Sequence, residues 1–335
     1  MPVIEKQVSR AEDIRYLALG VVAALLYGSV VFSLLFAMPL QTAWTRGGFR
    51  PFLIALATAM IGTAAWLAWQ YRGIASIEPS GYILMLTLPA GLAVAMAAAN
   101  AGFLASWPLV YRILPGTAIV AAAAAPTVYA LFTNAEIQEY LLRAIGALAE
   151  SLEPAGGEGY SGSVFRASLQ PEILLDTARR LIADGYAAVI YGFTFLAYWA
   201  GIRAAGPDAN ESRRMPRLSQ FRLPAGLIWV FLGCWATVMA LRIPGPAFTG
   251  SRLLQAAAWN LALTVTFCYA AQGLGIFRHF TERFAPAGPL RWMGTLFVVI
   301  LLANIATGVW TAGFLSVLGA TETWIPYRYS KGVQA

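Results

Sequence analysis

Eight stretches of this chain run for 18 residues or more without an Asp, Glu, Lys or Arg. A hydrocarbon core about 30 Å thick requires about 20 apolar residues in a helix that rises 1.5 Å per residue. Backbone amides in lipid must find partners within their own segment, so such stretches form helices. The pattern predicts an all-α, polytopic transmembrane bundle of about eight spans. The stretches cover 199 of the 335 residues and comprise 16–45, 51–71, 79–111, 113–135, 185–202, 223–241, 253–277 and 292–321.

The composition indicates the same class. Charged residues make up 12% of the chain and hydrophobic residues 59%, whereas roughly 25% of the residues in an ordinary soluble domain are charged. The net charge of +7 comes mostly from Arg between the apolar stretches, which favours positive-inside loops and anionic lipid over nucleic acid. The first stretch is too long for a cleavable signal peptide, whose apolar region has roughly 7–15 residues. We therefore expect a lipid bilayer as partner and no nucleic acid.

The N-terminal membrane region, residues 1–132, is predicted to hold four spans. The first runs from about Leu17 to Leu40, and the second covers 51–71. Only Arg112 interrupts the apolar run from 79 to 135, which is too long for one crossing. The turn residues around Pro108 and Pro115 predict a hairpin there, with spans near 82–105 and 113–132.

Residues 133–184 change character and predict an acidic, amphipathic extramembrane insert of two helices. Its first helix has Ile137, Leu141, Ile145, Leu148 and Leu152 on one face. A second begins after Pro171, and the Gly-rich segment 156–163 lies between them as a linker without the Lys-Ser/Thr pair of a phosphate loop. The insert either packs on the chain's own membrane region, lies among lipid headgroups or binds a protein partner.

The C-terminal membrane region, residues 185–321, is predicted to hold four more spans, near 186–204, 224–242, 253–277 and 289–317, before a tail at 322–335. The loop 203–222 is basic and is a second candidate surface for a protein partner. The positive-inside rule predicts that this loop is cytoplasmic. Its basic residues are Arg203, Arg213, Arg214, Arg217 and Arg222.

The spans contain no mid-membrane carboxylate, Lys, Arg or His, which argues against a proton or ion relay. Their polar groups are amides and hydroxyls, with Asn260, Gln272 and Asn304 the candidate ligand-binding residues for a small neutral molecule. The alternative is that these amides join helices to one another, at roughly 0.6–2 kcal/mol per hydrogen bond. The residue pattern favours the second interpretation.

No arrangement of residues predicts catalysis, a metal or a cofactor. His279 has no second ligand at a metal-binding spacing, and no Ser nucleophile is placed to use it. Cys234 and Cys268 are isolated within apolar stretches, which is typical of small core residues. We therefore expect a protein that is not an enzyme.

Several short pieces occur in a set order along the chain. They are Met38-Pro39-Leu40 with Gly48 and Pro51, then Phe221-Arg222-Leu223-Pro224 with Leu227-Ile228-Trp229, then Asn260-Leu261 with Gln272-Gly273-Leu274, and finally Leu318-Gly319 with Glu322 and Arg328. These pieces resemble the YybS-like family of uncharacterised bacterial multi-pass membrane proteins, domain of unknown function 2232. The match covers about 220–330 and, more loosely, the first 70 residues. The sequence departs from the family at Pro326, where the family has an acid.

The resemblance implies a bacterial inner-membrane protein, and a fold similar to the substrate-binding subunits of energy-coupling-factor transporters and to a rod-shape envelope protein. Two functions remain open. The one we expect from the sequence is binding or transport of a small neutral molecule, either alone or as a subunit that needs an energising partner. The alternative is a non-transporting scaffold or assembly subunit of a cell-envelope complex.

Overall fold

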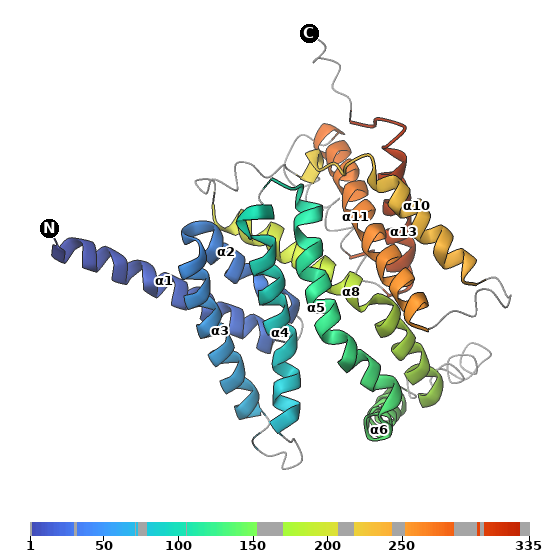
Figure 1. The fold of residues 1–335 in the computed structure, drawn as a ribbon, viewed down its shortest axis with the longest axis horizontal. Coiled ribbons are helices and arrows are strands. Elements are labelled where there is room, and N and C mark those ends of the chain that lie inside the picture. The colour runs from blue at the N-terminus through green and yellow to red at the C-terminus, as the bar shows by residue number, and fades with distance from the viewer. Residues whose placement is uncertain are drawn as a thin grey trace, which may run out of the picture. The chain divides into compact units, whose positions relative to one another are not determined.

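The computed structural model describes residues 2–29, 32–70, 72, 79–104, 106–152, 170–206, 218–242, 252–284, 300–301 and 305–328, and every regular element among them is helical (Figure 1). This confirms the all-α prediction for that part of the chain. The elements are α1 Pro2–Gly28, η1 Ser33–Leu35, α2 Ala37–Gly47, α3 Phe49–Gln70, α4 Pro79–Ala99, η2 Gly102–Leu104, α5 Leu109–Thr133, α6 Ala135–Leu152, α8 Pro171–Ala204, η4 Leu218–Gln220, α10 Leu227–Ala240, α11 Arg252–Phe284 and α13 Ile305–Thr321.

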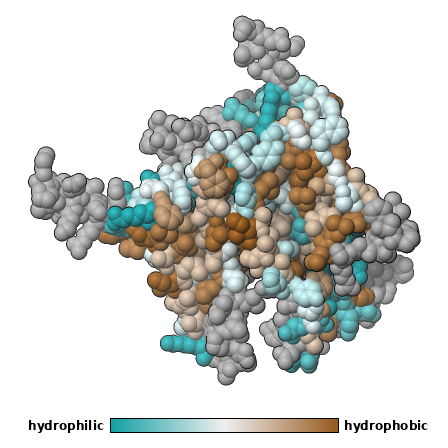
Figure 2. Space-filling model, viewed as in Figure 1, coloured by the Kyte–Doolittle hydropathy of each residue, from teal (hydrophilic) through white to brown (hydrophobic). Residues whose placement is uncertain are grey.

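Within the described residues, four helices are long and apolar enough to cross a membrane by length and composition: α3, α5, α8 and α11. Shorter apolar helices lie in α4 and α10. Large apolar side chains cover much of the visible surface (Figure 2), and Ile61 and Trp310 are 70% and 81% exposed. A water-soluble monomer rarely exposes apolar side chains so widely, because each costs free energy in water.

The first predicted span, from about Leu17 to Leu40, is wrong. The helix α1 ends at Gly28, and α2 begins separately at Ala37. Ser29 explains the break, because its Oγ donates to Leu26 O at 2.7 Å and accepts from Phe32 N–H at 3.1 Å. A serine that bonds local backbone groups in this way competes with the helical ladder. Pro39 lies in the first turn of α2, where its missing N–H costs nothing.

The predicted break near Arg112 is confirmed as a turn between two helices. The helix α4 ends at Ala99 and α5 begins at Leu109, so Pro115 lies inside α5 instead of in the turn. Arg112, in the first turn of α5, donates from Nε to Ala99 O at 3.2 Å. Its guanidinium carbon also lies 5.6 Å from the ring centre of Tyr198. The charge that interrupts the apolar run therefore satisfies the end of the preceding helix.

The predicted second insert helix and the fifth span form one helix. The 34 residues of α8 run from Pro171 to Ala204 without a break, and the expected boundary at 184 falls inside it. Gly185 lies at that point, but one glycine costs a helix only about 1 kcal/mol. The first insert helix is α6, and the Gly-rich segment 156–163 lies outside the described residues.

The chain forms two compact units, and four helices contribute residues to both. Unit 1 contains residues 1–120, 189–233 and 264–335, and unit 2 contains 121–188 and 234–263. The core of unit 1 includes Phe36, Phe52, Tyr191, Tyr198 and Tyr269. The described core of unit 2 is smaller and centres on Val238 and Ala262.

Within unit 1, α13 packs parallel to α11. Ser316 Oγ donates to Thr266 O at 3.0 Å, and three residues further along each helix Gly319 approaches Tyr269. The second contact lies three residues closer to the C-terminus than the first on both helices, so the helices run in the same direction. This parallel register brings the end of α13 to the level of Gln272.

Candidate functional site

The structure describes two of the three predicted site residues. Asn260 and Gln272 both belong to α11, twelve residues apart, whereas Asn304 lies outside the described residues. Asn260 falls in unit 2 and Gln272 in unit 1. Among the described residues, each amide bonds to its own set of partners.

The Asn260 amide joins α11 to α8. Its Nδ2 donates to Ala183 O at 2.6 Å and to Ala256 O at 2.8 Å. Its Oδ1 accepts from Ala187 N–H at 2.8 Å. Ala183 O and Ala187 N–H are the acceptor and donor of one helical turn, so a single amide holds both ends of that turn. The bonds use both Nδ2 hydrogens and the amide oxygen.

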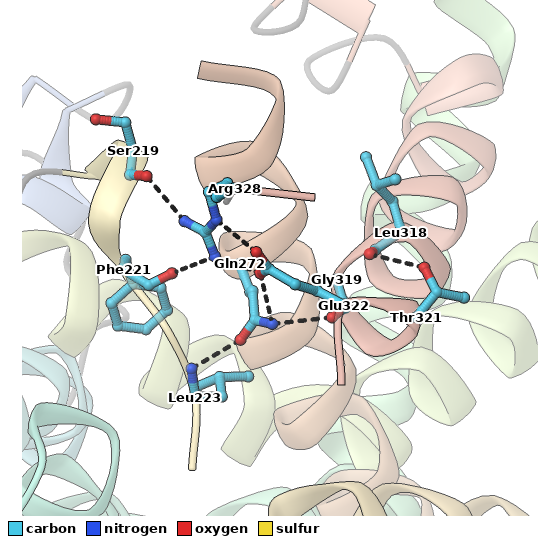
Figure 3. Close-up of polar contacts among 9 residues, drawn as sticks. All are labelled: Ser219, Phe221, Leu223, Gln272, Leu318, Gly319, Thr321, Glu322 and Arg328. Carbon is cyan, nitrogen blue, oxygen red and sulfur yellow. Dashed lines mark hydrogen bonds and ion pairs between the residues drawn. The ribbon is translucent and has the colours of Figure 1, made fainter. Parts of the chain in front are cut away.

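Gln272 is the centre of a buried polar cluster (Figure 3). Its Oε1 accepts from Leu223 N–H at 2.7 Å. Its Nε2 donates to Gly319 O at 2.9 Å and to the Glu322 carboxylate at 3.0 Å. One amide thus connects α11 to the segment before α10 and to the end of α13. We call Ser219, Phe221, Leu223, Gln272, Gly319, Glu322 and Arg328 the C-terminal polar cluster.

The charged members of this cluster form a buried ion pair. The side chains of Arg328 and Glu322 are only 3% and 5% exposed. Arg328 Nε donates to Glu322 Oε1 at 2.6 Å, and Nη2 donates to Oε2 of the same carboxylate. The remaining bonds of Arg328 go to backbone carbonyls, at 3.0 Å to Ser219 O and 2.9 Å to Phe221 O. A buried pair is stable only with such additional hydrogen bonds.

Glycines allow the backbones around the cluster to meet. A Cβ on Gly273 would overlap the carbonyl of Leu315, and one on Gly319 would overlap the carbonyl of Tyr269. Similarly, a Cβ on Gly275 would overlap Leu218 O. Small residues let membrane helices approach to backbone contact. The short distance between α11 and α13 is what lets Gln272 reach Gly319.

A pair of buried amides that bond to each other lies in unit 1, between α2 and the end of α4. Asn100 Nδ2 donates to Gln41 Oε1 at 2.6 Å, and Gln41 Nε2 donates to Asn100 Oδ1 at 3.2 Å. Thr42 Oγ1 donates to Gly201 O at 3.1 Å, where α8 passes close to α2. Sequence reasoning missed Gln41, because the first predicted span extended only to Leu40.

The buried amides and the buried carboxylate hold segments of the chain together by hydrogen bonds. The donors and acceptors of Asn260 and Gln272 bond to the chain's own groups, as does the Glu322 carboxylate. Among the described residues, no group of three or more His, Cys, Asp or Glu lies together to hold a metal.

An apolar depression of about 390 Å³ lies at the start of α5, lined by Trp107, Pro108, Tyr111, Leu114 and Pro115.

The sequence indicated Glu322 and Arg328 only as parts of the resemblance to the YybS-like family. An acid and a base six residues apart across Pro326 give a weak signal for a pair. The segments that carry the resemblance near 221–224, 272–274 and 318–328 all contribute to the C-terminal polar cluster. The sequence placed these segments in order but did not indicate that they meet.

The helices and their exposed apolar surface define a helical membrane protein. No family model, curated protein or solved structure matches the chain.

Proposed function

We propose that this protein is a non-transporting scaffold or assembly subunit of a bacterial cell-envelope complex, with about eight spans in the inner membrane. The observation that carries the proposal is that the described candidate amides, Asn260 and Gln272, use their donors and acceptors within the chain. A carrier of a neutral molecule needs polar groups that can exchange the chain for a ligand. Such exchange at Gln272 would leave the Leu223 N–H and the Gly319 carbonyl without their partner, at about 1–3 kcal/mol each.

The number of spans and the membrane are parts of the same proposal. Support for several spans comes from the four described helices that are long and apolar enough to cross a membrane, α3, α5, α8 and α11, and from the shorter apolar helices in α4 and α10. The number of about eight rests on the eight charge-free stretches of the sequence. The bacterial inner membrane is what the resemblance to the YybS-like family implies. Three segments that resemble this family meet at the C-terminal polar cluster, which supports the resemblance as a basis for the proposed membrane.

The competing proposal, a carrier of a small neutral molecule, uses Asn260 and Gln272 as ligand-binding groups. The scaffold proposal expects Asn260→Ala and Gln272→Ala to lower the thermal unfolding midpoint of the purified protein without any ligand. The carrier proposal expects stable variants that have lost a ligand-dependent rise in the midpoint. Measuring both midpoints with and without a library of neutral metabolites separates the two functions.

The scaffold proposal also requires a protein partner. Arg143 and Ala147 are exposed one turn apart on α6, so a photo-crosslinking residue at either position should capture the same envelope protein in intact cells. Ile61, exposed on the apolar helix α3, is the matched control and should capture lipid only. Recovery of lipid alone from all three positions would contradict the scaffold function.

A further inference from the structure

Arg179 lies on the face of α8 that packs inside unit 2. Positions 175, 179, 183 and 186 follow one another at helical spacing along this face. Leu175 is buried, Ala183 O accepts from Asn260 of α11, and Tyr186 Oη donates to Ala121 O of α5 at 3.3 Å. The guanidinium therefore leaves the helix on the side that meets α5 and α11.

Two nitrogens of Arg179 are buried without an acceptor. Its Nε and Nη2 have no hydrogen-bond partner, in contrast to the same two atoms of Arg328, which both donate to Glu322. Nε and Nη2 form one edge of the guanidinium, the edge that binds both oxygens of a carboxylate or phosphate. A buried cation that lacks an acceptor is costly, and one in a membrane helix commonly marks a functional site.

The described acids near Arg179 on α8 are engaged elsewhere or exposed. Asp176 accepts from Arg180 Nη2 at 2.7 Å, one turn before Arg180. Asp184 lies within electrostatic reach of Arg180 and Arg242. Glu172 is exposed in the first turn of the helix. Asp176 and Asp184 therefore interact with Arg180 and Arg242. The positive charge of Arg179 is not balanced by these two acids.

The depth of Arg179 indicates where an acceptor would come from. The charge-free part of α8, residues 185–202, extends about 27 Å, close to the thickness of the hydrocarbon core. Arg179 precedes it by six residues, or about 9 Å along the axis, which is next to the phosphate layer.

An aromatic group in unit 2 marks the edge of the hydrocarbon core, one to two helical turns from Arg179 along α8. Trp259, beside Asn260 on α11, packs edge-on against Trp235, and Arg242 lies 5.3 Å above its ring. Tryptophans gather at the membrane–water interface. Because Asn260 bonds to Ala183 and Ala187, Trp259 is level with the start of the charge-free part of α8.

We propose that Arg179 binds the phosphate group of a membrane phospholipid, with Nε and Nη2 donating to two phosphate oxygens. The site belongs to α8, α5 and α11 of unit 2 and is independent of the scaffold function. It assigns a lipid ligand to a residue that the sequence places in an extramembrane insert.

Native mass spectrometry of the full chain, delipidated in neutral detergent and titrated with phosphatidylglycerol, tests the site. Arg179→Gln should weaken binding of the first lipid about tenfold, the loss expected for a charged hydrogen-bonded pair. Arg179→Lys, which keeps the charge without the paired donors, should fall between wild type and Arg179→Gln. Arg180→Gln is the matched control, and its exposed neighbouring charge should change binding less than twofold.

Thermal unfolding excludes a merely structural effect. Without lipid, Arg179→Gln should unfold at the wild-type temperature or above, because it removes a half-buried cation whose Nε and Nη2 have no acceptor. Added phosphatidylglycerol should then raise the midpoint of wild type more than that of the variant. A galactolipid without phosphate should raise neither. Equal lipid binding by Arg179→Gln and wild type, or an equal loss in Arg180→Gln, would overturn the proposal.

Inorganic phosphate distinguishes the source of the oxyanion. At about 10 mM it should leave the wild-type midpoint unchanged, because a lipid phosphate gains most of its affinity from its anchored chains. An Arg179-dependent rise with inorganic phosphate alone would overturn the lipid assignment in favour of a soluble ligand. A lower midpoint for lipid-free Arg179→Gln would show that Arg179 already has an acidic partner in the chain, which also overturns the site.

Discussion

Arg328 and Glu322 show what a buried charge requires in this protein. Each arginine nitrogen has an acceptor, and both carboxylate oxygens have a donor. The pair ties the end of the described chain to the segment before α10. The Nε and Nη2 of Arg179 are buried as well, but they have no carboxylate or other acceptor. The contrast between two arginines of one chain separates a structural ion pair from a candidate ligand site.

Glu322→Leu should lower the free energy of unfolding by about 3 kcal/mol, because it leaves Arg328 buried and unpaired. Combining it with Arg328→Met should recover part of this loss, since the double variant removes both charges. Chemical unfolding in detergent measures both effects. Glu139→Gln breaks an exposed pair with Arg143 and should cost less than about 1 kcal/mol. A Glu322→Leu loss as small as this control would contradict the buried-pair interpretation.

Two glycines of α13 provide a test of close helix packing. Gly319→Ala should destabilise the protein by about 1–3 kcal/mol, because its Cβ would overlap the carbonyl of Tyr269. Gly313→Ala, on the same helix but with nothing within 4 Å, should be neutral or stabilising by up to about 1 kcal/mol. The unfolding midpoints in detergent give both values. Similar effects at the two positions would show that α13 does not pack on α11 through Gly319.

At the scale of the element, α8 differs most from expectation. Hydropathy and charge divide residues 171–204 into an amphipathic part and an apolar part, which predicts two helices. No proline interrupts the sequence, and Asn260 bonds to both sides of Gly185. Helix continuity depends on backbone bonding, which a change of side-chain polarity does not interrupt. The result is a helix of about 51 Å, longer than a bilayer core requires.

A distance measurement checks the continuity of α8. Spin labels at Ile173→Cys and Ala204→Cys should lie about 46 Å apart along the axis, from 31 residues at 1.5 Å each. A pair at Val189→Cys and Ala204→Cys, within the apolar part, should give about 22 Å and serves as control. The buried Cys234 and Cys268 are replaced by Ala for this experiment. A long-pair distance below about 35 Å would show a bend near Gly185.

At the scale of the molecule, arginines of unit 1 collect at one end of its helices. Arg46 donates to Ala204 O and Ala205 O at the end of α8, both at 3.2 Å. Arg112 donates to the end of α4, and Arg328 bonds to the segment before α10. Arg46 and Arg112 complement helix C-termini and also supply the positive charge that orients membrane proteins.

The positive-inside rule predicts that this end of unit 1 faces the cytoplasm. Gln220 is exposed within the basic loop 203–222, and Gln70 is exposed at the far end of α3. A membrane-impermeant maleimide should label Gln70→Cys in intact cells and Gln220→Cys only after permeabilisation. The buried native cysteines should keep the background low. The reverse labelling pattern would invert the proposed orientation.

Much of the fold could be predicted, because long apolar runs leave a backbone few alternatives to a helix. The turn before Arg112 followed from Pro108, and α6 followed from the spacing of Leu141 and Ile145. The end of α1 at Gly28 could not be predicted, since it depends on local bonds of Ser29 within an apolar run. Of the candidate site, the sequence identified Asn260 and Gln272 as buried amides but not the groups they bond.

The sequence by itself determined that this chain forms apolar helices with amides inside them and arginines between them, because hydropathy and charge are local properties. Only the tertiary structure decided which groups meet. It joined Arg328 to Glu322, enclosed Gln272 among three segments, and made Arg179 part of a membrane-length helix. These outcomes depend on helix register, on close glycine contacts, and on hydrogen bonds such as that from Arg328 to Ser219, 109 positions apart. Such contacts leave no periodic signal in the sequence.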